Sequence, residues 1–260
     1  MKFCRLVHDL GFNGLSLSMK IGGAFLFSLF SISSSFAQVS SLSLNSNSYK
    51  LFLQGKFSPD TMASFVLVPE NYTNKAGIYL QKDALSAFIL LSNQAKKDGI
   101  HLIILSATRN FVYQKGIWER KWGSSKFSSF VSGKARAQAI LSYSAMPGTS
   151  RHHWGTDIDL NSLSNSYFNS GEGEKVYKWL QLNAPKYGFC QVYSKKDSSR
   201  PDGYEEEKWH WSYLPLAKNY MADYSKFISS KDFFGFHGSE CFTELDIAKK
   251  YVLGINKKCY

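Results

Sequence analysis

The chain has 260 residues, of which 44% are hydrophobic and 20% are charged. These proportions exclude a disordered or collagen-like chain, and the length suits one large domain or two small ones. Lys and Arg total 31 against 20 Asp and Glu, a net charge of +11 that favours an anionic partner such as a cell wall, a membrane surface or nucleic acid. The four cysteines are too few for a disulfide-dense scaffold, and none forms a Cys-x-x-Cys pair.

The most apolar run of the chain, residues 21–32, has the features of a secretory signal peptide. Lys20 precedes it, and Ser35 and Ala37 are small residues at positions −3 and −1 of a cleavage site. The run is shorter than the roughly 20 apolar residues that a membrane-spanning helix needs. We therefore expect residues 1–37 to be removed on export to the periplasm or cell envelope, with no stable membrane insertion afterwards. An uncleaved membrane anchor is the alternative.

The start of the chain is itself open to interpretation. Residues 1–18 make the basic segment before the apolar run unusually long, and they include the acidic Asp9. A signal peptide beginning at Met19, directly before Lys20, would have the ordinary form. We interpret Met19 as the initiator and residues 1–18 as an artefact of the assigned gene start.

Three cysteines remain after residue 37: Cys190, Cys241 and Cys259. Export permits a disulfide, and the odd number leaves one thiol unpaired. The pairing is open, but we favour Cys241–Cys259 because both lie in the C-terminal tail, and we interpret Cys190 as a buried thiol.

The apolar pattern predicts short strands and helices in chain order. Residues 40–48 are rich in Ser and Asn and are expected to be flexible, and residues 51–79 are expected to be irregular or short-stranded. Helices are predicted over residues 83–97, 110–121, 133–144 and 172–187, and strands over residues 101–106, 156–160, 189–193 and 208–213. One or two further helices are expected from residue 216 onward, around the turn at residues 235–238. The fold class is α+β, with a small mixed or antiparallel sheet flanked by helices and a helical C-terminal tail.

Two segments concentrate side chains that bind metals. Ser150–Asp159 reads Ser-Arg-His-His-Trp-Gly-Thr-Asp-Ile-Asp, and Glu205–Trp211 reads Glu-Glu-Glu-Lys-Trp-His-Trp. Imidazole and carboxylate ligands without cysteine are typical of catalytic zinc sites, in which an open position is left to water and a nearby carboxylate takes a proton. The adjacent residues His152 and His153 would point in opposite directions if extended, so we expect at most one of them to bind metal.

Each segment also has an ordinary structural interpretation. Asp157 could simply pair with Arg151, and Glu205–Glu207 could form a solvated turn. The sequence has no Gly-x-Gly-x-x-Gly, P-loop or Gly-x-Ser-x-Gly motif, which removes the common nucleotide-binding and serine-hydrolase interpretations.

The order and spacing of three segments resemble the VanY-type zinc D-alanyl-D-alanine carboxypeptidases, which are LAS-type metallopeptidases. Pro147–Asp159 resembles their Ser-x-His-x-x-Gly-x-x-x-Asp motif, and Glu207–His210 resembles their Glu-x-Trp-His motif. Ser106–Arg109, followed by Gln114, resembles the element after their first core strand. The resemblance covers about residues 55–215 and implies a single zinc carboxypeptidase domain there. Residues 38–54 would be a lead-in, and residues 216–260 a helical extension packed on the domain.

The resemblance implies a role for each matched residue. Three of them would bind Zn2+: His152, Asp159 and His210. Glu207 would be the general base that activates water and later protonates the leaving amine. Arg109 would bind an anionic group of the substrate, with Gln114 and Ser150 as further substrate contacts. The implied substrate is a peptidoglycan stem peptide, whose terminal D-Ala would be removed by hydrolysis.

The sequence departs from the family pattern at two positions. A second histidine, His153, follows the expected ligand, and Asp157 replaces a residue that is usually small or apolar. Asp157 is interpreted either as a carboxylate that orients a metal ligand or Arg109, or as one partner of a surface salt bridge. The tryptophans that flank the expected ligands are interpreted as core residues rather than cleft walls: Trp154, Trp209 and Trp211.

Other functions are weighed against the zinc D,D-carboxypeptidase. An L,D-carboxypeptidase or a peptidoglycan endopeptidase would use the same scaffold. A non-catalytic zinc-containing cell-wall binding module would not need a general base, yet Glu207 is present. A nucleic-acid binder rests on charge alone, so no nucleic acid is expected as a partner, and the sequence carries no signal of an oligomeric state.

Overall fold

The computed structural model describes residues 46–260. The expected signal peptide, the choice between Met1 and Met19, and the first part of the lead-in segment lie outside these residues. The described residues belong to one compact unit. Among the described residues, no helix combines the length and the apolar character that crossing a membrane requires.

The central part of the chain forms a four-stranded antiparallel sheet. Its strands lie in the order β3, β4, β6, β5, and their bounds are Ile104–Ser106, Asp157–Leu160, His210–Tyr213 and Phe189–Gln191. A separate two-stranded sheet pairs β1 (Phe65–Leu67) with β2 (Tyr79–Gln81). All described strand pairings are antiparallel, and the α+β class expected from the sequence is confirmed.

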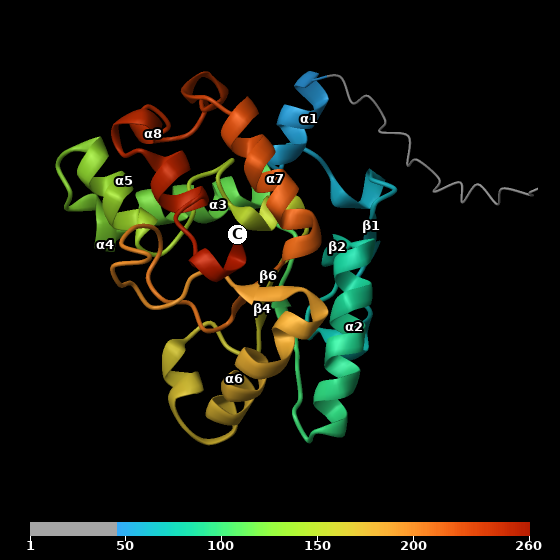
Figure 1. The fold of residues 1–260 in the computed structure, drawn as a ribbon. Helices are drawn as coiled ribbons and strands as arrows, with labels where there is room; N and C mark the ends of the chain where they lie inside the picture. Colours follow the sequence, from blue (N-terminus) through green and yellow to red (C-terminus); the bar gives the residue numbers. More distant parts are fainter. Residues whose placement is uncertain (1–45) are drawn as a thin grey trace, which may run out of the picture. The chain divides into compact units, whose positions relative to one another are not determined.

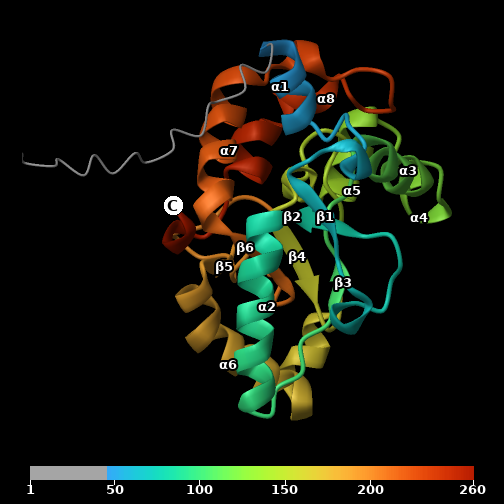
Figure 2. The same cartoon turned by 90° about the vertical axis from the view of Figure 1, so that its right-hand side faces the viewer.

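Eight α-helices surround the sheets in the described part of the chain: α1 (Ser46–Leu53), α2 (Lys82–Lys97), α3 (Phe111–Trp122), α4 (Ser125–Ser128), α5 (Gly133–Leu141), α6 (Gly171–Asn183), α7 (Leu214–Phe227) and α8 (Cys241–Glu244). Figures 1 and 2 show α2 and α6 in the lower half of both views, and α1, α7 and α8 at the top. Single helical turns join several of these elements, and the turn Arg151–Trp154 precedes β4 directly.

Local sequence explains where the central helices begin and end. The apolar residues of α2 recur at helical spacing and are buried, from Leu85 through Phe88 and Leu91 to Ala95. The chain leaves this helix through Gly99, which has a positive φ of 75° that glycine adopts without strain. The side chain of Asn110 accepts a hydrogen bond from the backbone N–H of Tyr113 and so caps the start of α3.

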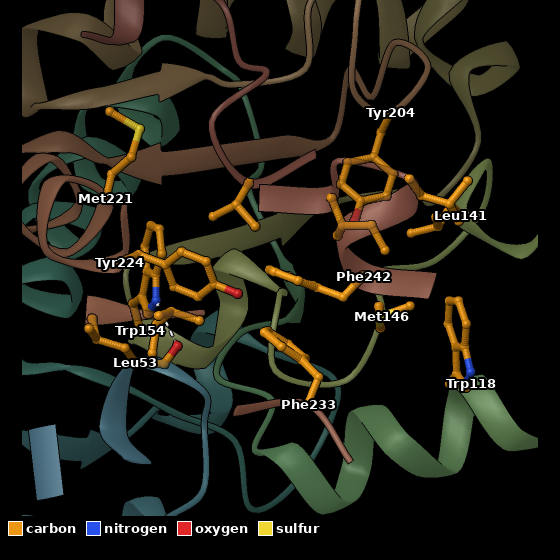
Figure 3. Close-up of a cluster of buried hydrophobic side chains, with 14 of the residues drawn as sticks. Leu53, Trp118, Leu141, Met146, Trp154, Tyr204, Met221, Tyr224, Phe233 and Phe242 are labelled. Carbon is orange, nitrogen blue, oxygen red and sulfur yellow. Dashed lines mark hydrogen bonds between the residues drawn. The ribbon is translucent and has the colours of Figure 1, made fainter. Parts of the chain in front are cut away.

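The buried apolar residues form two clusters on the two sides of the four-stranded sheet. One cluster lies between the sheet and helices α2 and α6, and includes Phe88, Ile158, Leu160, Leu180 and Trp211. The other cluster gathers side chains from α1, α3, α5, α7 and α8, and Figure 3 shows its centre around Trp118, Trp154, Tyr224, Phe233 and Phe242. Because Ile158 and Leu160 face the first cluster, the alternate residues of β4, Asp157 and Asp159, face the other side of the sheet.

The N-terminal helix α1 corrects part of the expectation of a flexible segment over residues 40–48 followed by irregular structure; residues 40–45 lie outside the described residues. Residues 46–53 are helical because Phe52 and Leu53 pack into the second cluster. The Leu53 carbonyl accepts a hydrogen bond of 3.1 Å from Nε1 of Trp154 (Figure 3). The short strands β1 and β2 agree with the expectation for the residues that follow.

The C-terminal segment returns to the edge strand β5 and is joined to it by a disulfide between Cys190 and Cys259. The favoured pair Cys241–Cys259 is therefore wrong, as is the interpretation of Cys190 as a thiol. Among the described residues, Cys241 is the free cysteine, and it is buried. Proximity in sequence did not predict the pairing because the C-terminal segment turns back toward β5. There the Asn256 N–H donates to the carbonyl of Val192, which directly follows β5, at 2.8 Å.

Replacing Cys190 and Cys259 together with Ser should lower the free energy of unfolding by about 2–4 kcal/mol, because a bond that closes a long loop restricts the unfolded chain. The two cysteines are 69 positions apart. Urea unfolding followed by tryptophan fluorescence measures the loss.

The matched control is Cys241→Ala, which leaves the disulfide intact. A reducing agent should destabilise the wild type and this control equally and should leave the double variant unchanged. A wild type that is insensitive to reduction would contradict the assignment.

Candidate metal centre

Six of the seven site residues expected from the sequence line one cleft: Arg109, Ser150, His152, Asp159, Glu207 and His210. The seventh, Gln114, is buried in α3 and donates to the carbonyl of Ala145 at 2.7 Å. Ala145 lines the cleft, so Gln114 supports the wall from behind. The cleft lies on the side of the sheet opposite α2 and α6, where Asp159 projects from β4.

Three buried side chains bring potential ligand atoms together. One atom from each of His152, Asp159 and His210 lies within 4.8 Å of the other two. Nε2 of His152 is 3.4 Å from Oδ1 of Asp159, and Nδ1 of His210 is 3.7 Å from the same oxygen. Asp159 and His210 are directly opposite each other in the β4–β6 register, and their side chains therefore share one face of the sheet.

The donor atoms fit a divalent cation that prefers nitrogen and oxygen ligands. Nε2 of His152 is buried and has no hydrogen-bond partner among residues 46–260, which is costly for a polar atom unless it has a ligand. The other nitrogen of this ring, Nδ1, lies 2.7 Å from the carbonyl oxygen of Ala107, and this contact fixes the ring orientation. Two imidazoles and one carboxylate are a common protein ligand set for Zn2+.

The adjacent histidine is engaged elsewhere. Nδ1 of His153 lies 2.5 Å from the carbonyl oxygen of Arg109, and Nε2 accepts the N–H of Gly148 at 3.1 Å. Burial lowers the pKa of His153 to about 3, so the ring is neutral and can donate from one nitrogen while accepting at the other. Gly55, with φ of 73°, lies against this ring, and a side chain at Gly55 would collide with it. The His153 ring thus contacts three separate backbone segments, at Gly55, Arg109 and Gly148.

Glu207 lies at the edge of the candidate metal-binding group, which consists of His152, Asp159 and His210. Its Oε2 is 2.9 Å from Nδ1 of His210, and its side chain is 22% exposed, in contrast to the buried ligand candidates. The Glu207 N–H donates to the Tyr193 carbonyl and its own carbonyl accepts from the His210 N–H, so the turn before β6 is held at both ends. This placement leaves a carboxylate beside the candidate metal-binding group and open to water from the cleft.

Asp157 is fully buried, and the interpretation as a surface salt bridge is therefore wrong. Its Oδ2 lies 3.1 Å from Nε of Arg151 and 2.8 Å from Nε2 of His210. Asp157 instead forms a buried ion pair with Arg151 and contacts an expected metal ligand, His210, at the same time.

Charge within the site shifts the pKa values of the buried groups. Burial opposes ionisation of Asp157 and Asp159, but neighbouring positive and imidazole groups hold the pKa of both carboxyls well below the usual range. The largest lowering influence on the pKa of Asp157 is the charge of Arg151. The largest lowering influence on the pKa of Asp159 is His152. Burial lowers the pKa of His210, but hydrogen bonds with Asp157 and Glu207 raise it to about 9 overall. Burial and the positive charge of Arg109 both lower the pKa of His152.

Arg109 presents a guanidinium group to the cleft. Its backbone N–H donates to the His152 carbonyl at 3.2 Å, which attaches the segment after β3 to the ligand-bearing turn. Among the described residues no carboxylate forms an ion pair with Arg109, and its buried Nε has no hydrogen-bond partner. The group is therefore available to a planar anion such as a carboxylate.

The aromatic walls of the cleft were only partly anticipated. Trp154 and Trp211 are buried in the two apolar clusters, as expected. Trp209 is half-buried: it packs against the cluster under α2 and α6 and also lines the cleft, so it is a core residue and a cleft wall at once. Tyr193 and Tyr204 also line the cleft. The ring of Tyr193 lies edge-on to the His210 ring, with 4.9 Å between the ring centroids. No sequence motif marks these tyrosines, which come from the long loop after β5.

Comparisons with known proteins agree with the motifs. The model of the family VanY, described as D-alanyl-D-alanine carboxypeptidase, matches residues 77–216. The D-alanyl-D-alanine carboxypeptidase of Enterococcus faecalis is 32% identical over 126 residues, which are 48% of this chain and 45% of that protein. The putative carboxypeptidase YodJ of Bacillus subtilis is 33% identical over 140 residues, 52% of this chain and 46% of that protein. The chain spans about half the length of these curated relatives.

Two solved structures resemble part of the chain. The LdcB LD-carboxypeptidase has a TM-score of 0.49 and 24% identity, and the match covers 67% of this chain and 77% of that one. VanYB in complex with D-alanine-D-alanine has a TM-score of 0.45 and 27% identity, and covers 58% of this chain and 79% of that one.

Changing the two adjacent histidines separately should distinguish their roles. His152→Ala should abolish stoichiometric zinc binding, because it removes a side chain whose free nitrogen faces the other two ligands. His153→Gln should retain one bound zinc but lose about 2 kcal/mol of folding stability through its disturbed backbone contacts. Metal content after dialysis and thermal unfolding measure the two effects. Loss of zinc in the His153 variant alone would reverse the assignments.

Proposed function

The chain belongs to the VanY family of D-alanyl-D-alanine carboxypeptidases, and from this premise we propose that it is a zinc-dependent peptidase that hydrolyses the terminal D-Ala-D-Ala bond of peptidoglycan stem peptides. The observation that carries the proposal is the convergence of His152, Asp159 and His210 beside Glu207 in one cleft. The expected export of the protein would bring it to this substrate, and its positive charge would favour residence on an anionic wall.

His152, Asp159 and His210 would hold the zinc ion. Three protein ligands leave a further position open, as catalytic zinc sites require. A bound Zn2+ supplies polarisation of the scissile carbonyl and a lowered pKa for the attacking water. The raised pKa of His210 means that a proton and the cation compete for this ring.

Glu207 would move the proton. Its carboxylate is partly exposed and is 2.9 Å from Nδ1 of His210, so a water in the cleft beside the metal-binding group is within its reach. The carboxylate would accept a proton as that water attacks and would then donate it to the departing amine.

Arg109 would select a substrate with a free C-terminus. A carboxypeptidase must recognise the terminal carboxylate, which an internal peptide bond lacks. The Arg109 guanidinium lines the cleft, and its Nε has no partner among the described residues, so it suits this group. This argument favours removal of a terminal residue over cleavage within a cross-linked peptide. Ser150, which also lines the cleft, would contact the bound peptide, and Gln114 would act through the wall that it supports.

The function is tested with the chain from residue 38 onward and a stem pentapeptide that ends in D-Ala-D-Ala. Mass spectrometry should show loss of one alanine, abolished by a chelator and restored by Zn2+. Removal of alanine from a tetrapeptide but not from the pentapeptide would contradict the D,D specificity and would indicate an L,D-carboxypeptidase. With zinc bound and no peptide cleaved, the enzymatic proposal itself would fail.

Glu207→Gln should bind zinc and fold as the wild type does, but its kcat should fall about 10²- to 10⁴-fold because the proton acceptor is lost. Its neighbour Glu206 provides the matched control, since Glu206→Gln removes an adjacent carboxylate that does not line the cleft. Steady-state rates with the pentapeptide compare the two variants. Equal rates in both would remove Glu207 from the role of base.

A further inference from the structure

Asp157 has an unusually complete set of buried contacts. Its Oδ2 accepts hydrogen bonds from Nε of Arg151 at 3.1 Å and from Nε2 of His210 at 2.8 Å. Its Oδ1 accepts from the hydroxyls of Ser212 at 2.6 Å and Thr156 at 2.8 Å. A carboxylate without solvent contact is costly unless its oxygens are satisfied in this way, so the surroundings of Asp157 are organised around its charge.

The contact with His210 determines which ring nitrogen is free. Nε2 points at Asp157, whereas Nδ1 points at Asp159 and Glu207. A proton held on Nε2 by Asp157 leaves the lone pair of Nδ1 for a cation. Carboxylates that accept from the far nitrogen of a metal-binding histidine fix its tautomer and ring orientation and increase its basicity.

The strand register produces this arrangement. Asp157 pairs with Ser212 and Asp159 pairs with His210 across β4 and β6. Asp157 therefore meets His210 diagonally on the same face of the sheet. The two aspartates of the Asp-Ile-Asp segment bracket one imidazole, Asp159 on the side of the metal-binding group and Asp157 on the opposite side.

Arg151 supplies the compensating charge. Its side chain is buried beside Asp157, its Nη2 donates to the Ser212 hydroxyl at 2.9 Å, and its guanidinium lies over the Trp154 ring at 4.8 Å. Arg151 directly precedes His152 in the same turn. Asp157, which contacts the expected ligand His210, is thus paired with Arg151, which lies in the same turn as the expected ligand His152.

We propose that Asp157 is a positioning residue that holds the His210 ring with Nδ1 toward the metal centre, with Arg151 as its counter-charge. This inference rests on the proposed function, because it requires a cation at His152, Asp159 and His210. The competing account is that Asp157 serves only as the internal partner of Arg151, in which case metal affinity would not depend on it.

The test measures zinc affinity by competition with a chelating dye, together with thermal unfolding. Asp157→Asn keeps the shape of the side chain but loses its charge and should weaken zinc binding about 10-fold, within the range for such orienting groups. Because a single variant leaves Arg151 buried without a partner and could unfold, the decisive variant is Arg151→Met with Asp157→Leu. It removes the ion pair as a whole, so the local net charge equals that of the wild type.

The double variant should fold but bind zinc about 10- to 100-fold more weakly than the wild type. Ser212→Ala is the control, because it removes one donor to Asp157 and leaves the contact with His210; its zinc affinity should stay within about 3-fold of the wild type. A folded double variant with wild-type zinc affinity would overturn the positioning role while leaving the proposed function intact. A wild type that binds no zinc would instead overturn the proposed function, and the inference with it.

Discussion

The site depends on the antiparallel pairing of β4 with β6. This pairing sets Asp159 opposite His210 and Asp157 opposite Ser212, which joins two segments that are about 50 positions apart in the sequence. Side chains alternate along a strand, so a slip of one residue would turn both aspartates of β4 to the opposite face of the sheet. The candidate metal-binding group and the carboxylate of Asp157, on the opposite side of the His210 ring, therefore depend on one register.

Burial on the far face of the sheet fixes that register. Ile158 and Leu160 alternate with the aspartates, and Trp211 pairs with Ile158 across the strands; all three belong to the cluster under α2 and α6. A one-residue slip would remove these apolar side chains from that cluster and bring the aspartates into it without their hydrogen-bond partners, each at a cost of about 1.5–3 kcal/mol or more. The core thus holds β4 and β6 at the register that places Asp159 opposite His210. The turn with His152 precedes β4, and the turn with Glu207 precedes β6.

Local patterns in the sequence were sufficient to predict most of the regular elements and the ligand candidates. Helix α2 has strict apolar spacing and a terminal glycine, and its bounds agree closely with the expectation. The three expected ligands come together as the motifs implied. Features that depend on tertiary packing were not predictable. Helix α1 forms because Leu53 packs into the cluster of buried side chains from α1, α3, α5, α7 and α8. Cys190 pairs with Cys259 because the C-terminal segment returns to β5. The role of Asp157 in contacting both Arg151 and His210 likewise follows only from the strand register.

The most direct measurement of the central claim is a crystal structure of the zinc-loaded chain with anomalous scattering at the zinc edge. The account predicts one ion bound by Nε2 of His152, a carboxylate oxygen of Asp159 and Nδ1 of His210, with Nε2 of His210 still donating to Asp157. An ion bound through Nε2 of His210, or through His153, would contradict it.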